Sequence, residues 1–225
     1  MKIISIEGNI GSGKSTFVEM LKQKYHENHK IHFLQEPVDE WDTIRDKNGI
    51  SILENYYKDQ KKYAFSFQMM AYISRLSSLK NAIETNKYDY IITERSLYTD
   101  KEVFCKMLYD DGFIEEIEYT IYLKWFNEFI PNYEITYVYL YTDTNISFKR
   151  VHKRNRKGEY IPIEYLEKCK QYHDNWLKDN CILINSNKDR TITLESMSDL
   201  ISYIEPLTET RIISEEVMDT SGQTF

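Results

Sequence analysis

Cysteine, basic excess and long apolar runs are all scarce in this chain of 225 residues. There are three cysteines, Cys105, Cys169 and Cys181, and they are scattered without C-x-x-C spacing. An odd, scattered set of this kind is typical of reduced, mostly buried thiols in a cytosol-like compartment. No apolar run approaches the length of a membrane-spanning helix, and Glu7 interrupts the first apolar stretch too early for a signal peptide. We therefore expect a cytoplasmic protein without a membrane partner.

Positive charge is also in short supply, because 29 lysines and arginines face 36 aspartates and glutamates and leave a net charge of −7. A nucleic-acid-binding surface usually carries a basic excess, so the composition argues against a nucleic-acid partner. The length and the hydrophobic content of 41% suit one α/β domain with a full core. We predict a single domain over residues 1–205 and a polar, flexible tail over residues 206–225.

Glycine is rare as well, with seven residues in the chain, yet three of them fall within the nine positions 8–16. This segment fits G-x-x-x-x-G-K-[ST], and it lies between a β-branched stretch at residues 2–6 and a helical apolar pattern. Glycines let the backbone turn its N–H groups toward a phosphate, and the N-terminus of the following helix adds partial positive charge. Lys14 can reach the β- and γ-phosphates of a nucleoside triphosphate, and the Ser15 hydroxyl can bind Mg²⁺. The predicted donor-binding residues here are Gly8, Asn9, Ile10, Gly11, Ser12, Gly13, Lys14, Ser15 and Thr16.

Short apolar strands alternate with helical patterns along the rest of the chain, which indicates a parallel sheet covered on both faces. We predict the further strands at residues 31–35, 90–93, 135–140 and 181–184. Helices are expected at residues 52–57, 63–85, 103–108, 114–129, 162–177 and 194–204. The expected fold class is α/β, with a five-stranded parallel sheet flanked by helices.

Two carboxylates follow predicted strands, at the edge where ligands bind in open α/β sheets. Glu36 follows the strand at residues 31–35, and beside bound phosphates it can accept a proton from an attacking hydroxyl. Glu94 and Arg95 follow the strand at residues 90–93, where Glu94 would anchor the magnesium shell and Arg95 would hold phosphate oxygens. The alternatives are a surface glutamate that caps a loop at position 36 and a structural Glu94–Arg95 pair.

The one dense basic block of the sequence lies at residues 149–157. Such a run is usually a solvated helix end. Arginine forks match the geometry of phosphates, so in a phosphate-binding protein of negative net charge the block is better explained as a lid over the triphosphate. Its predicted donor-binding residues are Arg150, Arg154 and Arg156.

Gln68 and Arg75 lie seven residues apart and therefore share one face of the helix expected at residues 63–85. A Gln amide and an Arg guanidinium can each pair with the edge of a base. An ordinary polar helix face would show the same spacing, so the pattern leaves both interpretations open.

Together these motifs resemble the deoxynucleoside kinase family, which includes deoxycytidine, deoxyguanosine and deoxyadenosine kinases. The likeness is collinear from residue 3 to about residue 185. Beyond the phosphate loop it rests on Glu36-Pro37-Val38 with Trp41, Phe65-Ser66-Phe67-Gln68 with Ser74-Arg75, residues 94–100, Thr120-Ile121-Tyr122 with Trp125, residues 154–159, residues 161–166 and Trp176-Leu177. The resemblance implies a P-loop kinase fold with an Arg-rich lid. It also implies transfer of the γ-phosphoryl group of ATP, with Mg²⁺, to the 5′-hydroxyl of a 2′-deoxynucleoside in nucleotide salvage.

The resemblance also assigns roles to single residues. Glu36 would take the proton of the 5′-hydroxyl, with Arg95 beside the same oxygen and Lys14 on the phosphates. Tyr57 and Glu159 match the positions that hold the 3′-hydroxyl, although the loop from residue 156 to residue 161 is about one residue shorter than in deoxycytidine kinases. Gln68 would read the base edge and Phe104 would stack on the base. The other pocket residues it implies are Trp41, Leu53, Arg75 and Asp100.

Arg75 and Asp100 occur together in family members that favour deoxycytidine or purine deoxynucleosides, so the resemblance implies weak thymidine activity. The family is commonly homodimeric, and we expect a homodimer here. The candidate contact lies on the helix expected at residues 114–129, where the apolar residues could equally be core: Ile117, Ile121, Trp125 and Phe129. Two alternative functions remain, a nucleoside monophosphate kinase of thymidylate-kinase type and a nucleotide-binding protein without catalytic activity.

Overall fold

A five-stranded parallel sheet forms the centre of the chain in the computed structural model, which describes residues 1–156, 159–188, 198, 202, 204 and 206. The strands lie in the order β2-β3-β1-β4-β5, and every neighbouring pair is parallel. Their bounds are β1 Lys2–Glu7, β2 Ile31–Leu34, β3 Tyr90–Glu94, β4 Ile135–Tyr141 and β5 Ile182–Asn185. The prediction of an α/β fold with five parallel strands is confirmed, and each predicted strand end differs from the observed one by at most one residue.

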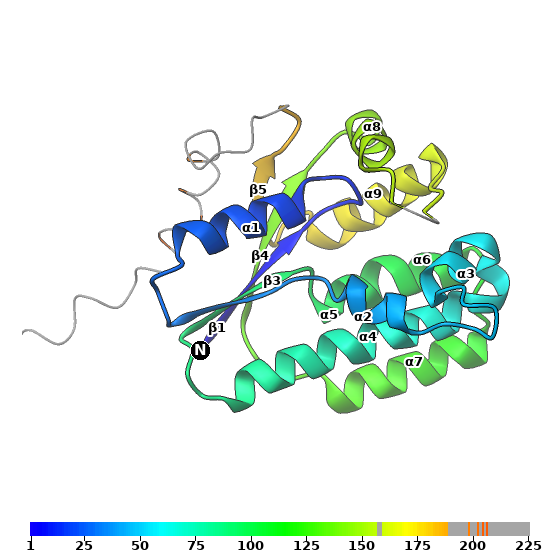
Figure 1. Cartoon of the computed structure of the whole chain (residues 1–225), viewed down its shortest axis with the longest axis horizontal. Helices are drawn as coiled ribbons and strands as arrows, with labels where there is room; N and C mark the ends of the chain where they lie inside the picture. The colour runs from blue at the N-terminus through cyan, green and yellow to red at the C-terminus, as the bar shows by residue number, and fades with distance from the viewer. Residues whose placement is uncertain (157–158, 189–197, 199–201, 203, 205, 207–225) are drawn as a thin grey trace, which may run out of the picture. The chain divides into compact units, whose positions relative to one another are not determined.

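Helices flank this sheet, and Figure 1 shows α4 and α7 side by side, with α1 across the strands from them. The helix bounds are α1 Lys14–Lys24, α2 Val38–Thr43, α3 Ile52–Lys58, α4 Gln60–Glu84, α5 Leu97–Thr99, α6 Lys106–Asp110, α7 Glu116–Phe129, α8 Thr144–Arg154 and α9 Ile163–Leu177. A π-helical segment, η1, spans Asp100–Cys105 between α5 and α6. None of the described helices is long and apolar enough to cross a membrane.

The main hydrophobic core lies around α4, which is 25 residues long. Its small and aromatic side chains pack against β1, β3 and α7, and Ala71 and Tyr72 are among its buried residues. Gln68 and Arg75 are buried on the same helix, at 2% and 7% exposure. The interpretation of Gln68 and Arg75 as part of an ordinary solvated helix face is therefore wrong, because both polar side chains point into the protein.

Several helical predictions need correction. The helix expected at residues 103–108 is part of a longer helical stretch that begins at Leu97, and α2 and α8 were not expected as helices. Only Ser147 and Val151 are buried on α8, so its charged sequence offers little apolar periodicity to detect. The helix expected at residues 194–204 and the tail expected at 206–225 lie almost wholly outside the described residues, as do positions 157 and 158 of the basic block.

The apolar stripe on α7 faces outward. Ile117 is 68% exposed, and Ile121, Trp125 and Phe129 are 42%, 45% and 43% exposed. The interpretation of these residues as core is therefore wrong for this chain on its own. Tyr122 and Phe126, on the opposite face of the helix, fill the core instead.

Candidate active site

The phosphate loop joins the C-terminal end of β1 to the first turn of α1. Two of its glycines have left-handed backbone and closely packed surroundings. A Cβ atom at Gly8 would lie 2.9 Å from the Leu140 carbonyl oxygen, and one at Gly11 would lie 2.5 Å from the Ser147 carbonyl oxygen. Only glycine fits these positions, so the loop is shaped by β4 and α8 as well as by its own sequence.

The side chains of Lys14 and Asn9 make different hydrogen bonds. Lys14 Nζ donates a hydrogen bond to the Asn9 carbonyl oxygen at 2.8 Å, and the lysine is 4% exposed. Burial and the nearby Arg95 lower the pKa of Lys14 to about 7. The Asn9 side chain donates to the Leu166 carbonyl oxygen on α9, so it fastens the loop to its surroundings. Lys14 is the side chain of the two that remains able to bind phosphate.

Ser15 and Glu94, the predicted magnesium ligands, lie together. Ser15 Oγ donates a hydrogen bond to Glu94 Oε1 at 2.6 Å. A hydroxyl and a carboxylate are hard oxygen ligands, and Mg²⁺ in kinases is usually bound by one or two such groups together with substrate phosphates and water. The pair therefore fits Mg²⁺. No group of three His, Cys, Asp or Glu residues gathers as a metal site in the described parts of the chain, and this mode of binding does not need one.

Glu36 lies between two buried arginines. Arg95 Nη1 and Arg75 Nη2 contact Glu36 Oε1 at 2.6 Å and 3.2 Å. Burial alone would raise the pKa of Glu36, but Arg95, Arg75 and Lys14 outweigh it and lower the pKa to about 2. The interpretations of Glu36 as a surface loop cap and of Glu94 and Arg95 as a mutual ion pair therefore do not fit, because Glu94 binds Ser15 and Arg95 binds Glu36.

Arg75 joins three partners at once. Its Nε donates to Asp100 Oδ2 at 2.9 Å, its Nη1 to the Glu94 carbonyl oxygen at 2.7 Å, and its Nη2 to Glu36. Burial would lower the pKa of Arg75, but Asp100 and Glu36 more than offset this and raise it above its ordinary value. Asp100 begins η1, while Arg75 comes from α4. This network ties α4 to the start of η1, to the end of β3 and to Glu36 after β2.

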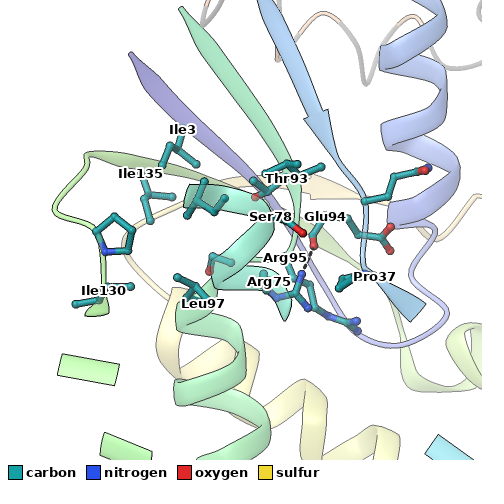
Figure 2. Close-up of a pocket in the computed structure, with 15 residues that line it drawn as sticks. Ile3, Pro37, Arg75, Ser78, Thr93, Glu94, Arg95, Leu97, Ile130 and Ile135 are labelled. Carbon is teal, nitrogen blue, oxygen red and sulfur yellow. Dashed lines mark hydrogen bonds between the residues drawn. The ribbon is translucent and has the colours of Figure 1, made fainter. Parts of the chain in front are cut away.

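A small cavity of about 30 Å³ lies behind these arginines. Figure 2 shows Arg75 and Arg95 at one end of it and Ile3, Ile130 and Ile135 toward the other, and the dashed line joins Arg75 to Glu94. The apolar lining keeps bulk water from the rear of the guanidinium groups. The ion pairs of this site are therefore formed in surroundings of low polarity, where they are stronger than at a surface.

Polar and aromatic side chains line the region beside Arg75. Within the described part of the chain, Gln68 Oε1 is buried without a hydrogen-bond partner, as is Arg95 Nε. Buried polar atoms of this kind are usually satisfied by a ligand or by water. Trp41 donates from Nε1 to Ser74 Oγ at 2.8 Å and packs edge-on against Phe67. Leu53 is a partly buried member of the same cluster.

Phe104 lies between Arg95 and His173. The Arg95 guanidinium carbon is 5.0 Å from the centre of the Phe104 ring, and the His173 ring meets it edge-on at 6.3 Å. His173 is fully buried, and burial lowers its pKa to about 3, so it is neutral at physiological pH. The sequence pattern gave no reason to single out His173, because its ring contacts, with Phe104 and Tyr139, come from residues far along the chain.

Tyr57 and Glu159 interact electrostatically, although Glu159 belongs to the shortened loop at residues 156–161. Burial and the Glu159 carboxylate raise the pKa of Tyr57 well above its ordinary value. Glu159 accepts two hydrogen bonds of 2.6 Å from Arg154 Nη2. Two residues expected to bind different substrates, Arg154 and Glu159, thus bind each other in this structure.

The other lid arginines differ from Arg154. Arg150 Nη1 donates to the Ser186 carbonyl oxygen at 2.9 Å and lies 3.5 Å from the Ser12 carbonyl oxygen, and its Nη2 donates to the Lys188 carbonyl oxygen. It therefore bridges the phosphate loop and the segment after β5. Arg156 contributes its carbonyl oxygen, which accepts from the Glu159 amide.

Glu7, Ser96 and Thr99 also belong to this site, and sequence reasoning missed their part in it. Thr99 Oγ1 donates to Glu7 Oε2 at 2.5 Å, and Ser96 and Thr99 cap each other. The available signal was a charged residue at the end of an otherwise apolar strand, next to the first glycine of the phosphate loop.

Comparison with known proteins gives a consistent result. A sequence model of the deoxynucleoside kinase family matches residues 4–220. Human deoxycytidine kinase is 32% identical over 234 residues, covering 93% of this chain and 89% of that protein. A probable deoxycytidine kinase of fowlpox virus is 36% identical over 183 residues, covering 80% of this chain and 73% of the viral protein. The mitochondrial deoxyguanosine kinase of Xenopus laevis is 28% identical over 220 residues, covering 89% of this chain and 79% of that protein.

Proposed function

The chain belongs to the deoxynucleoside kinase family, and from that premise we propose that it transfers the γ-phosphoryl group of ATP to the 5′-hydroxyl of a 2′-deoxynucleoside. The observation that carries the proposal is the Glu36 carboxylate, which is held by Arg95 and Arg75 next to the phosphate loop. The relatives named above are deoxycytidine and deoxyguanosine kinases, which supports a deoxynucleoside as the acceptor.

Glu36 would bind and orient the 5′-hydroxyl. Its pKa of about 2 keeps the side chain ionised at neutral pH, so it can accept a hydrogen bond from the hydroxyl. A carboxylate of such low pKa is a weak base before the reaction begins. Its main contribution is therefore to aim the oxygen, and it takes the proton as the new P–O bond forms and the hydroxyl becomes acidic.

Arg95 and Lys14 would neutralise the negative charge of the transferring group. Arg95 Nε has no partner and the guanidinium is fixed by Glu36, so donors for phosphate oxygens are already in place. Ser15 and Glu94 would hold Mg²⁺, which when bound supplies further positive charge to the phosphates. Arg150, Arg154 and Arg156 would close on the donor, with Arg154 exchanging Glu159 for phosphate oxygens.

The acceptor is more consistent with a nucleoside than with a nucleotide. A thymidylate-type kinase needs free cations for the phosphate of its acceptor. Here both buried arginines already bind carboxylates, Glu36 and Asp100. Adding an acceptor phosphate would bring it against these negative charges at a cost of several kcal/mol. The catalytically inactive alternative is disfavoured because Lys14, Ser15, Glu36, Glu94 and Arg95 are all present around one centre.

Base preference would follow from the Arg75–Asp100 pair. A base whose edge cannot complement this buried pair leaves polar groups unpaired, at a cost of about 1–3 kcal/mol. We therefore propose that deoxycytidine or a purine deoxynucleoside is preferred to thymidine, with Gln68 bound to the base edge. Trp41, Leu53 and Phe104 would wall the base, and Tyr57 and Glu159 would hold the 3′-hydroxyl.

We also propose that the active form is a homodimer joined through α7. Four apolar side chains at helical spacing, each 42% to 68% exposed, form a stripe that a second copy would cover. Replacement of Ile121 with Glu should shift the protein from dimer to monomer in analytical ultracentrifugation. An unchanged sedimentation coefficient would place the dimer contact elsewhere.

An initial-rate panel with Mg-ATP and each of the four deoxynucleosides tests the activity. We expect turnover of deoxycytidine or of a purine deoxynucleoside and poor turnover of thymidine. Glu36→Gln should lower kcat by about 10²- to 10⁴-fold while ATP binding persists. Glu40→Gln, an exposed change on the neighbouring helix, is the matched control and should leave kcat unaltered. Full activity of Glu36→Gln would refute the assigned role of this carboxylate.

A further inference from the structure

Glu7 is a buried carboxylate that the proposed reaction does not use. It is 0% exposed at the end of β1. Its Oε1 accepts a hydrogen bond from Ser5 Oγ at 2.7 Å, and its Oε2 accepts one from Thr99 Oγ1 at 2.5 Å. Burying a charge is unfavourable unless strong hydrogen bonds compensate it. Two hydroxyl donors to a carboxylate supply bonds of this strength.

The partner Thr99 belongs to a tight turn. Its Oγ1 accepts from the Ser96 amide at 3.1 Å, and its amide donates to Ser96 Oγ at 3.2 Å. The turn at residues 96–99 stands between two residues of the acceptor site, because Arg95 directly precedes it and Asp100 directly follows it. Whatever holds this turn therefore sets the position of both side chains.

Strand β1 holds the turn from both ends. Arg95 has a φ of 64°, a left-handed conformation that non-glycine residues rarely adopt, and its amide donates to the Ile6 carbonyl oxygen at 3.0 Å. The next residue, Glu7, binds Thr99 at the other end. Ser5, two residues before Glu7 on the same strand, accepts a hydrogen bond at its Oγ from Thr93 Oγ1 at 3.2 Å. Figure 2 shows Thr93, Glu94 and Arg95 in succession, with Arg95 reaching the region of Arg75.

We propose that Glu7 is a positioning residue, which ties β1 to the turn at residues 96–99 and thereby holds Arg95 at the reaction centre. Gly8 follows Glu7 directly, so the same strand end starts the phosphate loop and anchors the arginine. The bond between the Glu7 carboxylate and the Thr99 hydroxyl thus adds to the Arg95–Ile6 backbone bond in setting the spacing between the phosphate loop and the Arg95 guanidinium. This inference rests on the kinase activity proposed above.

The test compares substitutions that cut the link with one that preserves it. Glu7→Gln keeps the volume of the side chain but replaces one acceptor oxygen with an NH₂ group. Thr99→Val removes the donor hydroxyl, and Thr99→Ser keeps it. We expect kcat to fall about tenfold or more for Glu7→Gln and for Thr99→Val, with the Kd of ATP within about twofold of wild type. Thr99→Ser should restore most of the wild-type kcat.

The matched control is Thr142→Val. Thr142 is also buried, at 2% exposure, but its hydroxyl has no hydrogen-bond partner among the described residues, so removing it cuts no described contact between β1 and the turn at residues 96–99. A Thr142→Val enzyme should retain its kcat. Combining Glu7→Gln with Thr99→Val should reduce kcat no further than either change alone, since both cut the same connection.

Hydrogen–deuterium exchange gives a second readout that does not depend on turnover. The amides of Arg95, Ser96 and Thr99 should exchange faster in Glu7→Gln and Thr99→Val than in the wild type and in Thr142→Val. If the two variants exchange faster but the wild-type protein phosphorylates no deoxynucleoside, the function is refuted and the structural link is kept. Unchanged exchange, unchanged kcat, or a loss of ATP binding that matches the loss of kcat would each overturn the positioning role.

Discussion

The buried arginines and the lid arginines of this kinase are bound in opposite ways. The side chains of Arg75 and Arg95 are 8% and 6% exposed, and both bind carboxylates on other elements. Arg154 is 36% exposed at its side chain and binds a glutamate five residues further along the chain. Arg150 binds backbone carbonyl oxygens. The first pair has its geometry in place before any substrate arrives, whereas under the proposed function the lid arginines would exchange their present partners for phosphates.

This difference indicates that the charges of the buried arginines contribute to the stability of the fold, whereas those of the lid arginines would contribute to binding. In the buried cluster a lost partner leaves an unpaired charge in apolar surroundings, which is costly. At the lid, Arg154 is itself 36% exposed and water can compensate it, although the side chain of its partner Glu159 is 3% exposed, so the cost to stability is smaller than in the buried cluster. Substitutions at the two places should therefore differ most in the free energy of unfolding.

Arg75→Met should cause the largest loss in the free energy of unfolding and so show the difference between the buried arginines and the lid arginines most clearly. It leaves Asp100 without its guanidinium partner and should lower the free energy of unfolding by about 3–5 kcal/mol in urea titrations. Lys80→Met on the exposed face of the same helix is the control, and it should change stability by less than about 0.5 kcal/mol. Adding Asp100→Ala to Arg75→Met should recover part of the loss. Equal effects at positions 75 and 80 would contradict the comparison.

The pH dependence of stability should report on Glu36. Its pKa is about 2 in the folded protein against an ordinary value of 4.5, so the unfolded chain binds more protons between these values. The stability that Glu36 contributes is fully present above pH 4.5 and is lost as pH falls through 2, with a total of roughly 3 kcal/mol. Urea titrations from pH 6 to pH 2.5 should show the gap between wild type and Glu36→Gln narrowing. A constant gap would mean that the arginines do not hold the carboxylate as described.

A pair of glycine substitutions tests the contact between the phosphate loop and the lid helix. Gly11 and Gly49 have nearly equal φ values, 80° and 78°, so alanine strains both to the same extent. A Cβ at Gly11 meets the Ser147 carbonyl oxygen, but nothing lies within 4 Å at Gly49. Gly11→Ala should therefore cost about 1–3 kcal/mol more than Gly49→Ala in thermal or urea unfolding and should also weaken ATP binding. Similar losses of stability at both sites would mean that α8 shifts at little cost to accommodate a Cβ atom at Gly11.

Arg154→Ala should have the smallest effect on stability. We expect a loss of about 1 kcal/mol, since Arg154 is itself 36% exposed, although the Glu159 side chain that it leaves is 3% exposed. Its effect should appear in kcat/KM for ATP and should shrink as salt is raised from 0.05 to about 0.5 M, where screening reaches a few ångströms. Lys153→Ala, one residue earlier and also exposed, serves as the control. A large loss of stability in Arg154→Ala would show that the lid arginine is structural.

Much of this architecture follows from local sequence. The strand before the phosphate loop, the glycines and the carboxylates at the ends of β2 and β3 were all predictable, because parallel strands bring their carboxyl ends to one edge. Gln68 and Arg75 shared a face as their spacing requires.

The pairings of long side chains were not predictable. Arg75 reaches Glu36, Glu94 and Asp100 only because α4, β2, β3 and η1 meet there, and no local pattern encodes that meeting. The same holds for Arg154, whose expected target was a phosphate and whose observed partner is Glu159. The π-helical turn at residues 100–105 has no sequence signal that we can identify, although such turns often occur at functional sites.

The buried lysine of the phosphate loop has a consequence for calorimetry. With a pKa of about 7, Lys14 is only partly protonated in the empty protein near neutral pH. Bound phosphates favour its ammonium form, so nucleotide binding takes a proton from the buffer. The measured enthalpy of binding will therefore change with the ionisation heat of the buffer chosen, and affinity will decline as the solution becomes more alkaline. If the phosphate loop binds nucleotide as proposed, it would act as a proton acceptor as well as an anion site.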